Sequence, residues 1–338
     1  MATTVPAIVA GQSAAGSATL YFETPRTLST DEARFPQLLR VGEELVVMYQ
    51  DTVRDGEDGG SIYLSMQRTN DGRTWREEAR RLGPFPFAGS SEPFVFSAVV
   101  GPLGDLFVAV TRSAEETVVF RSPDGGTTFE LVHTVTTTQT NVAPRLFRSA
   151  DGSVVLFVNT NLDGRQQSVY THSADGSTWS SIQQLEPDEE VGLVFLPAMA
   201  NLQGRDFVVY QGLNITARST YQLYLRYSDD GGRTWQDGGR LTNFVDPTQS
   251  NDADLYDNQR PDLVADPSGE QLLLAWERRF QSGSPQVYLQ GLAPDGSSNG
   301  LVEEVTGRFD LARFPRIAFD DGEPVLVWFT NPRGNSRV

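Results

Sequence analysis

Residues 228–235 read SDDGGRTW, and this short stretch recurs along the chain. Residues 69–75 read TNDGRTW, residues 173–179 read SADGSTW, and residues 122–129 give the looser copy SPDGGTTF. Each copy places Asp and Gly between a Ser or Thr and an aromatic residue. Because Asp accepts hydrogen bonds from nearby backbone and Gly adopts positive φ, the pattern predicts a tight hairpin turn with an aromatic ring packed beneath it.

The turns recur at nearly constant spacing. Successive aspartates are separated by 53, 51 and 55 residues, and a degenerate copy follows 65 residues after the fourth. The aspartates are Asp71, Asp124, Asp175, Asp230 and, in the degenerate copy, Asp295. A fixed period of about fifty residues indicates a repeat architecture.

A second repeat consists of a strand that begins at a proline, followed by a turn and then by a second apolar strand. It runs from RFPQLLRVGEELVVMY at 34–49 to RFPRIAFDDGEPVLVWF at 313–329. Its six prolines are Pro36, Pro93, Pro144, Pro197, Pro261 and Pro315. An alternating strand follows each of the first five copies and leads to the Asp turn. The pattern therefore predicts that each unit forms four antiparallel strands. Six such units predict an all-β, six-bladed β-propeller.

The sixth unit ends after two strands, so another segment has to complete it. SATLYFETPRTLS at 17–29 is the only strand-like segment without an assignment. We expect this N-terminal strand to complete the last blade and to close the ring. The chain is then one domain over residues 1–338, in which 1–16 form a flexible leader.

Composition narrows the range of partners. The formal net charge of −17 disfavours nucleic acid and anionic membranes as partners, and it means that an anionic ligand needs a local basic pocket.

No apolar run approaches the length of a membrane span. The absence of Cys excludes disulfides and thiol chemistry. No signal peptide is visible, which leaves the compartment open, with secretion favoured. We expect a monomer.

The Asp turn resembles the Asp-box of the sialidase superfamily, S-x-D-x-G-x-T-W. ARFPQLL at 33–39, followed by MYQ at 48–50, resembles the opening FRIP strand of that family. The resemblance covers most of the chain as architecture and implies a propeller with the turns on its outer rim. In active members, three arginines hold the carboxylate of sialic acid, an Asp is the acid/base, and a Tyr activated by a Glu is the nucleophile. Asp-box propellers without glycosidase activity also exist, so the fold leaves the function open.

Blade one carries the best matches to the site that the resemblance implies. Arg34 corresponds to the first carboxylate-binding arginine, and Arg54 is a second substrate-binding candidate. Asp58 or Asp55 corresponds to the catalytic acid/base, because gaps leave the register open. Glu92 stands where many members have Ser-Asp-Pro in blade two. A solvated strand end and an acidic glycine-rich loop explain the same residues without a function.

The residues of the covalent chemistry are absent from their expected positions. Ala200 lies in the stretch of blade four where the activating Glu is expected, and Gln222 lies where the next arginine is expected. Arg313 and Phe314 occupy the place of the nucleophilic Tyr. Tyr256, just before blade five, would replace that Tyr only after a rearrangement of the site.

The prolines of blades one and six share the sequence RFP, and these blades are neighbours across the predicted ring closure. Arg34 and Arg313 are therefore expected to flank one pocket, with Arg260 or Arg316 nearby. Such a basic cluster suits a carboxylate or sulfate group on a sugar. Alternatively, Asp55, Asp58 or Glu92 of blades one and two pair with these arginines across the central axis of the propeller.

The long insertion before blade five contains Asp252, Asp254 and Asp257, which are hard oxygen ligands of the kind that calcium prefers. Their spacing differs from that of an EF-hand, and a solvated acidic loop is the alternative. No other cofactor is indicated. His133 and His172 lie in different blades, so neither a zinc site nor a Ser-His-Asp triad is predicted.

Two functions fit these observations. The first is a sialidase-like exo-glycosidase that acts on an acidic or neutral sugar with an altered catalytic site. The second is a non-catalytic propeller that binds a glycan, a glycoconjugate or a protein. The blade-one matches favour the first, and the missing Tyr and Glu favour the second. The sequence thus predicts a sialidase-like, glycan-directed protein and leaves its enzymatic activity undecided.

Overall fold

The computed structural model describes residues 32–54, 60–76, 80–86, 96–137, 142–162, 164–188, 190–214, 220–242, 256–280, 283–307, 311–320 and 322–330. In these ranges the strands form six antiparallel sheets, five of four strands and one of two. No helix long and apolar enough to cross a membrane occurs in the described part. The prediction of an all-β fold built from four-stranded antiparallel blades is confirmed. We call each sheet a blade and number the blades in chain order.

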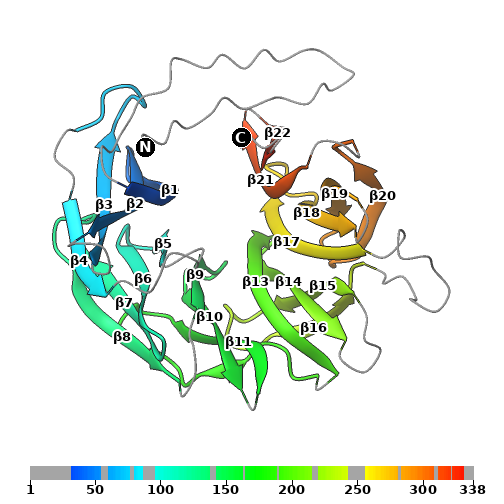
Figure 1. The fold of residues 1–338 in the computed structure, drawn as a ribbon, viewed down its shortest axis with the longest axis horizontal. Coiled ribbons are helices and arrows are strands. Elements are labelled where there is room, and N and C mark those ends of the chain that lie inside the picture. The colour runs from blue at the N-terminus through cyan, green and yellow to red at the C-terminus, as the bar shows by residue number, and fades with distance from the viewer. Residues whose placement is uncertain are drawn as a thin grey trace. The chain divides into compact units, whose positions relative to one another are not determined.

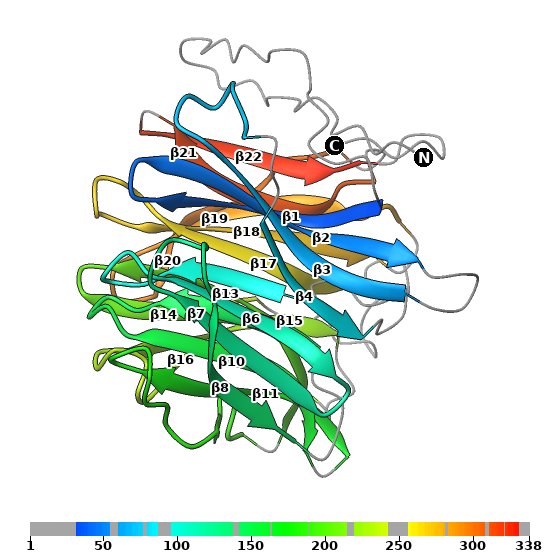
Figure 2. The ribbon, with the colours of Figure 1, turned by 90° about the vertical axis from the view of Figure 1, so that its left-hand side faces the viewer.

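The first compact unit ends at Leu185 and contains blades one to three (Figure 1). Figure 2 shows these three sheets stacked one upon the next. Their strands are β1 (Glu32–Val41), β2 (Glu44–Arg54), β3 (Gly60–Thr69), β4 (Arg80–Pro86), β5 (Phe96–Val100), β6 (Leu106–Ser113), β7 (Glu116–Ser122), β8 (Glu130–Thr136), β9 (Val142–Arg148), β10 (Val154–Leu162), β11 (Arg165–Ser173) and β12 (Gln183–Gln184).

The second unit begins at Glu186 and contains blades four to six. In each blade, strands that are adjacent in sequence are also neighbours in the sheet. Its strands are β13 (Val191–Leu202), β14 (Arg205–Asn214), β15 (Tyr221–Ser228), β16 (Gln236–Arg240), β17 (Tyr256–Ala265), β18 (Leu272–Phe280), β19 (Gln286–Leu292), β20 (Ser298–Glu304), β21 (Arg313–Asp320) and β22 (Glu323–Phe329).

The second strand of a blade buries both of its faces, because alternate side chains point to opposite neighbouring blades. In β6, Val108 and Val110 belong to the core shared with blade one, whereas Ala109 belongs to the core shared with blade three. In β18, Leu274 packs toward blade four and Ala275 toward blade six. Burial on both faces explains why these strands are continuous apolar runs.

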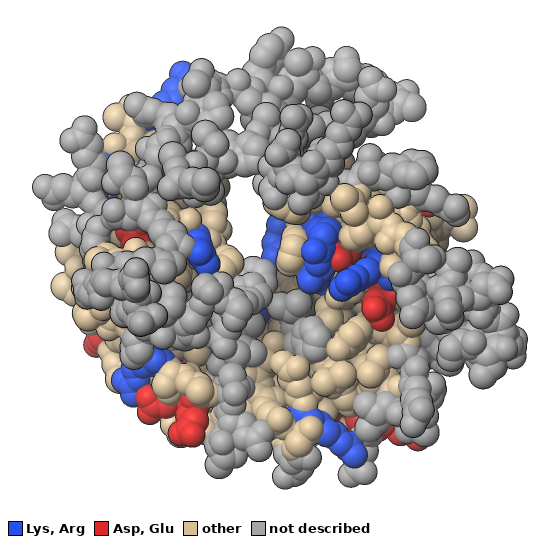
Figure 3. Space-filling model, in the orientation of Figure 1, with Lys and Arg blue, Asp and Glu red and all other residues tan. Residues whose placement is uncertain are grey.

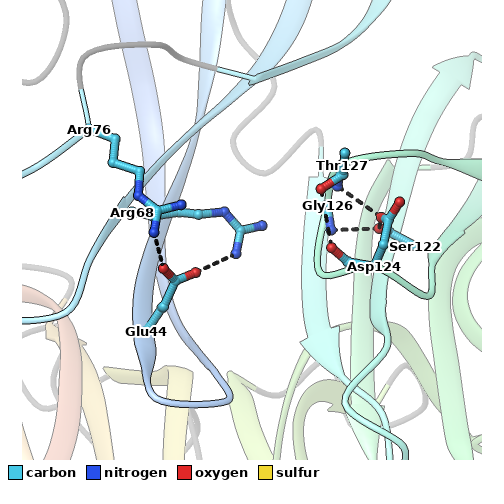
Figure 4. A network of polar contacts seen from close by, with 7 residues as sticks. All are labelled: Glu44, Arg68, Arg76, Ser122, Asp124, Gly126 and Thr127. Carbon is cyan, nitrogen blue, oxygen red and sulfur yellow. Dashed lines mark hydrogen bonds and ion pairs between the residues drawn. The ribbon is translucent and has the colours of Figure 1, made fainter.

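The Asp turns have the hydrogen bonds that the sequence predicts (Figure 4). Asp124 Oδ1 accepts from the amides of Thr127 at 2.9 Å and Thr128 at 2.8 Å, and from Ser122 Oγ at 2.7 Å. Amides that follow Asp71, Asp175 and Asp230 donate to those carboxylates in the same way. One side chain thus satisfies several turn amides that would otherwise lack partners.

The turn glycines allow each turn to approach the preceding blade closely. A Cβ atom on Gly126 would lie 2.5 Å from Met66 Cε and 2.9 Å from Arg68 Nη2, a guanidinium that donates to Glu44 (Figure 4). A Cβ on Gly176 would lie 2.5 Å from Phe107 Cζ. The Asp turn therefore acts as a contact between blades as well as a hairpin.

The aromatic residues that close the turns are partly buried, and two of them pack against the cores between blades. Phe129 packs against the core between blades one and two, and Trp179 packs against the core between blades two and three. Trp179 also stacks on His133 with ring centroids 4.9 Å apart. A ring at the end of a sheet has packing partners on one side and solvent on the other.

Hydrogen bonds link the first strands of consecutive blades. The first strand of a blade is an edge strand, so its outward amides need acceptors from outside its own sheet. A side chain on one blade supplies the acceptor for an amide of the next at 2.8–2.9 Å. The pairs are Gln37 with Ala98, Ser97 with Leu146, and Asp262 with Ile317.

Blade six consists of β21 and β22 in the described part of the chain. The segment 17–29, predicted to complete it, and the leader 1–16 lie outside the described residues. One closed six-bladed ring over residues 1–338, formed by a single monomeric domain, therefore stays a prediction.

The contact between a turn and the preceding blade can be tested with two glycines of positive φ. Gly176 (φ 73°) faces Phe107, whereas a Cβ on Gly164 (φ 80°) would have no atom within 4 Å. Ala at either site costs about 1 kcal/mol of backbone strain, and Gly176→Ala adds about 1–3 kcal/mol of overpacking. Urea unfolding should therefore show Gly176→Ala clearly less stable than Gly164→Ala. Equal destabilisation would contradict the proposed contact.

The turn aspartates should make the fold sensitive to acid. The amide of Thr178 is the main group that holds the pKa of Asp175 well below its usual range. The folded state then binds fewer protons than the unfolded state, so stability is present above about pH 4 and decreases as the pH falls below that value. In chemical unfolding at a series of pH values, Asp175→Asn should differ from the parent most at neutral pH and least in acid. A difference that grows in acid would exclude this account.

Candidate functional site

The first strands of blades five and six are bulged at the same position. β17 and β21 change register beside their prolines, and the residue before each proline has left-handed backbone, with φ of 54° at Arg260 and 53° at Phe314. Phe35 in β1 has the same conformation, with φ of 53°. Non-glycine residues in this region are strained by about 1–3 kcal/mol, so surrounding contacts have to hold them.

Buried side chains from neighbouring strands hold these two bulges. Gln211, on β14, accepts from the amide of Arg260 through Oε1 at 2.9 Å. Glu277, on β18, accepts from the amide of Phe314 through Oε2 at 3.3 Å. Both acceptors are almost completely buried, so each bulge is fixed from inside the second unit.

The Glu277 carboxylate, which is 0% exposed, is held by two arginines. Arg260 Nη1 donates to both carboxylate oxygens at 2.7 Å, and Arg313 Nε lies 3.4 Å from Oε1. A buried carboxylate without such partners is strongly destabilising. Glu277 therefore fixes the positions of both arginines, and because it has no exposed surface it is a positioning residue.

Both guanidinium groups lie over one aromatic ring. Arg260 Cζ is 4.2 Å and Arg313 Cζ is 5.2 Å from the centroid of the Phe314 ring, which is cation–π geometry. The side chain of Arg260 is 19% exposed and that of Arg313 is 35% exposed, so both reach the surface. We call Arg260, Glu277, Arg313 and Phe314 the arginine cluster.

Figure 3 shows where basic side chains gather on the second unit. The chain contains no lysine, so the blue atoms belong to arginines, and they gather on the face viewed over β17, β18 and β21. Within the arginine cluster, two positive charges meet one negative charge. This local positive excess in an acidic chain suits a carboxylate or sulfate group, which guanidinium forks bind with two parallel hydrogen bonds.

A second buried ionic group contains a Tyr and a Glu, the residue types that the resemblance implies for the nucleophile and its activator. Tyr210 Oη donates to Glu186, Arg226 Nη2 lies 2.6 Å from Glu186 Oε1, and Arg226 Nε donates to Tyr210 Oη at 3.3 Å. Burial, with the charge of Glu186 adding to it, raises the pKa of Tyr210 well above its ordinary value. A buried phenol kept protonated in this way is a structural group and a poor nucleophile.

Only some of the candidate site residues predicted in blades one and two are among the described residues. Arg34 lies on β1 opposite Gln50 and belongs to the first unit, whereas Arg313 belongs to the second, so their common pocket stays a prediction. Arg54 ends β2, and its side chain is outside the described part. Asp55, Asp58 and Glu92 also lie outside the described residues, so their assigned roles stay predictions.

Asp257 has a structural partner. Its Oδ1 accepts from the amide of Tyr221 at 2.8 Å, and burial raises the pKa of its carboxyl group. Asp252 and Asp254 lie outside the described residues. Within the described ranges no group of three or more metal-ligating side chains occurs, and the calcium site stays a prediction.

The positions where the resemblance expects catalytic residues hold structural side chains. Ala200 is buried in the core of blades four and five. Gln222 accepts from Asn258 Nδ2 at 3.0 Å in a buried network. Tyr256 covers the guanidinium of Arg278, whose Cζ lies 4.3 Å from the ring centroid. Ala200 and Gln222 offer neither a nucleophile nor a general base, and the use of Tyr256 as a substitute nucleophile stays untested.

Sequence reasoning identified Arg260 and Arg313 but missed Glu277. A signal was present in the repeat: the residue paired with the second position before the proline is Gln50, Asn159, Gln211 and Glu277 in blades one, three, four and five. A column of polar residues at the end of apolar strands marks a buried polar layer, and only Glu277 carries a charge there.

Neither a scan of protein-family models nor a search of curated proteins found a match. Among solved structures, the chain is similar to an α-L-arabinanase of Penicillium chrysogenum solved with arabinobiose, at 15% identity and a TM-score of 0.57, covering 89% of each chain. It is also similar to a GH93 α-L-arabinofuranosidase of Fusarium graminearum with arabinobiose, at 14% identity and a TM-score of 0.59, covering 89% of this chain and 88% of that one.

A sialidase of Trypanosoma rangeli is similar at 15% identity and a TM-score of 0.55, over 98% of this chain and 55% of that one. The chain thus spans about half the length of this sialidase. All three neighbours are propeller glycosidases. The resemblance to the sialidase superfamily is confirmed at the level of the fold, and identities this low concern the fold alone.

Removing the charge of Glu277 should destabilise the second unit. Glu277→Gln leaves two arginines facing a neutral amide in a largely buried site, and breaking such a pair costs about 3 kcal/mol. The measurement is the free energy of unfolding in urea. Glu303→Gln, on the exposed strand β20, is the matched control and should have little effect. Equal stability of both variants would show that Glu277 does not hold the arginine cluster.

Proposed function

We propose that this chain is a glycan-directed protein that binds an acidic sugar at the arginine cluster. One observation carries the proposal: two arginines with partly exposed side chains have guanidinium groups that are fixed by the buried Glu277 and stacked over Phe314. Pre-positioned arginines lose little conformational freedom when they bind, so their hydrogen bonds to a carboxylate contribute more of their energy to affinity.

The choice of a sugar is supported by the fold. Two of the neighbouring structures contain arabinobiose, and a third is a sialidase. The choice of an acidic sugar is supported by the charge of the cluster, because a neutral sugar does not require two guanidinium groups. Phe314 adds an apolar surface on which the C–H groups of a sugar ring can pack.

The geometry supports binding more strongly than turnover. A retaining glycosidase needs an accessible, activated nucleophile and a second group that exchanges protons. Glu277 is completely buried with both oxygens bonded to Arg260, and Tyr210 is buried and bonded to Glu186. We therefore propose that ordinary sialosides are bound without being hydrolysed at an enzymatic rate.

A glycoside hydrolase with an altered catalytic site is the second candidate. It is favoured by the propeller glycosidases among the structural neighbours and by the blade-one match at Arg34. In that case Asp58 or Asp55 would be the acid/base, with Arg34, Arg54 and Glu92 as substrate-binding residues.

Binding can be tested by titration calorimetry with N-acetylneuraminic acid and galacturonic acid, and with galactose as the neutral probe. The parent should bind at least one acid, and Arg313→Ala should leave the response to galactose unchanged. Arg313→Ala should weaken acid binding at least about tenfold, which corresponds to about 1.4 kcal/mol. Arg313 is the better target, because Arg260→Ala would leave Glu277 without its closest partner. Arg240→Ala, an exposed change on β16, is the charge-matched control.

Acid binding that survives in Arg313→Ala, or that falls equally in Arg240→Ala, would contradict the proposed site. Chromogenic sialoside and arabinofuranoside substrates test the second candidate across acid and neutral pH. We expect no enzymatic release from either. Release that Asp58→Asn or Arg34→Ala abolishes would favour the hydrolase over a binding protein.

A further inference from the structure

A hollow of about 710 Å³ lies in the first unit, between the ends of strands from blades two and three. β8 contributes Thr136, and the turn that precedes β7 contributes Glu115. β12 contributes Gln183 and Gln184 from the other side. The volume lies within the range of about 300–1,000 Å³ that is usual for small-molecule sites.

Hydroxyl and amide groups dominate the polar lining. Thr136 and Gln184 are exposed at the entrance. Thr160 Oγ1 donates to Thr137 Oγ1 at 3.1 Å, which joins the walls formed by the two blades. Gln183 Oε1 accepts from Tyr170 Oη at 2.9 Å, and this bond orients its amide so that the NH₂ group remains as a donor. The hollow thus presents both donors and acceptors.

An apolar surface lies among these groups. Ile182 is 40% exposed and offers aliphatic surface to a ligand. Leu162 and Val169 also line the hollow. Alternating apolar and hydroxyl-bearing surface matches a molecule that has C–H faces and a rim of hydroxyl groups.

The charge of the hollow excludes the ligand class of the arginine cluster. Among the described residues of its lining, Glu115 is the one with a charge, and none is an arginine. Glu115 would repel a carboxylate or sulfate, and the described lining offers no guanidinium to bind one. We propose that this hollow is a second carbohydrate site that takes a neutral sugar, in a different unit from the arginine cluster and independent of it.

The test uses the isoleucine methyl groups, because the chain contains five isoleucines and, among the described residues, Ile182 is the one that lines the hollow. A protein labelled at these methyls is titrated with lactose, maltose and cellobiose, and with galacturonic acid as the anionic probe. Ile182→Val identifies the Ile182 resonance by its disappearance. We expect saturable shifts of this resonance with at least one neutral disaccharide, little shift with galacturonic acid, and no change at the buried Ile62.

Two variants complete the test. Thr136→Ala combined with Gln184→Ala should weaken neutral-sugar binding at least about tenfold, and both residues are exposed, so the fold should tolerate the change. Thr134→Ala, an exposed residue of β8 outside the hollow, is the matched control. Arg313→Ala should leave neutral-sugar binding unchanged, which separates this site from the arginine cluster. The proposal is overturned if no neutral disaccharide shifts the Ile182 resonance, if galacturonic acid shifts it equally, or if the double variant binds like the control.

Discussion

Glu277 carries a negative charge with no exposed surface, and the candidate site depends on how that charge is compensated. Its two oxygens each accept a hydrogen bond from Arg260, and one of them forms an ion pair with Arg313. The carboxylate also accepts from the amide of Phe314, whose backbone is left-handed. A single buried carboxylate therefore orders two guanidinium groups and one strained backbone segment. This explains why a chain of net charge −17 can present a positive surface at this place.

The repeat provides the scaffold on which this arrangement is built. In several blades, the end of the second strand carries a buried polar side chain that faces the bulge of a first strand. In blade four it is Gln211, which holds the amide of Arg260 across to blade five. In blade five it is Glu277, whose charge adds an ionic role to the same structural position. The position that serves blade-to-blade hydrogen bonding in blade four therefore holds the arginine cluster together in blade five, where the residue is Glu and not Gln.

The sequence was sufficient to predict the blades, since the Asp turns and the prolines of the first strands mark their boundaries and the turn chemistry is local. It also identified Arg260 and Arg313, because both adjoin a proline of the repeat. Glu277 was missed because its role depends on strand register and on a bulge, neither of which is visible in a single sequence.

The Tyr210–Glu186 pair was missed for a similar reason, since the two residues are 24 positions apart and meet only in the folded second unit. The partial exposure of Trp179 reflects its place at the end of a sheet, which the turn motif does not encode.

The most direct measurement of the central claim is a crystal structure of the protein soaked with galacturonic acid or N-acetylneuraminic acid. The account predicts sugar density at the arginine cluster, with the carboxylate bonded to Arg313 and Arg260, the ring over Phe314, and Glu277 still buried behind the arginines. Ordered sugar bound elsewhere in the protein, with none at the cluster, would contradict it.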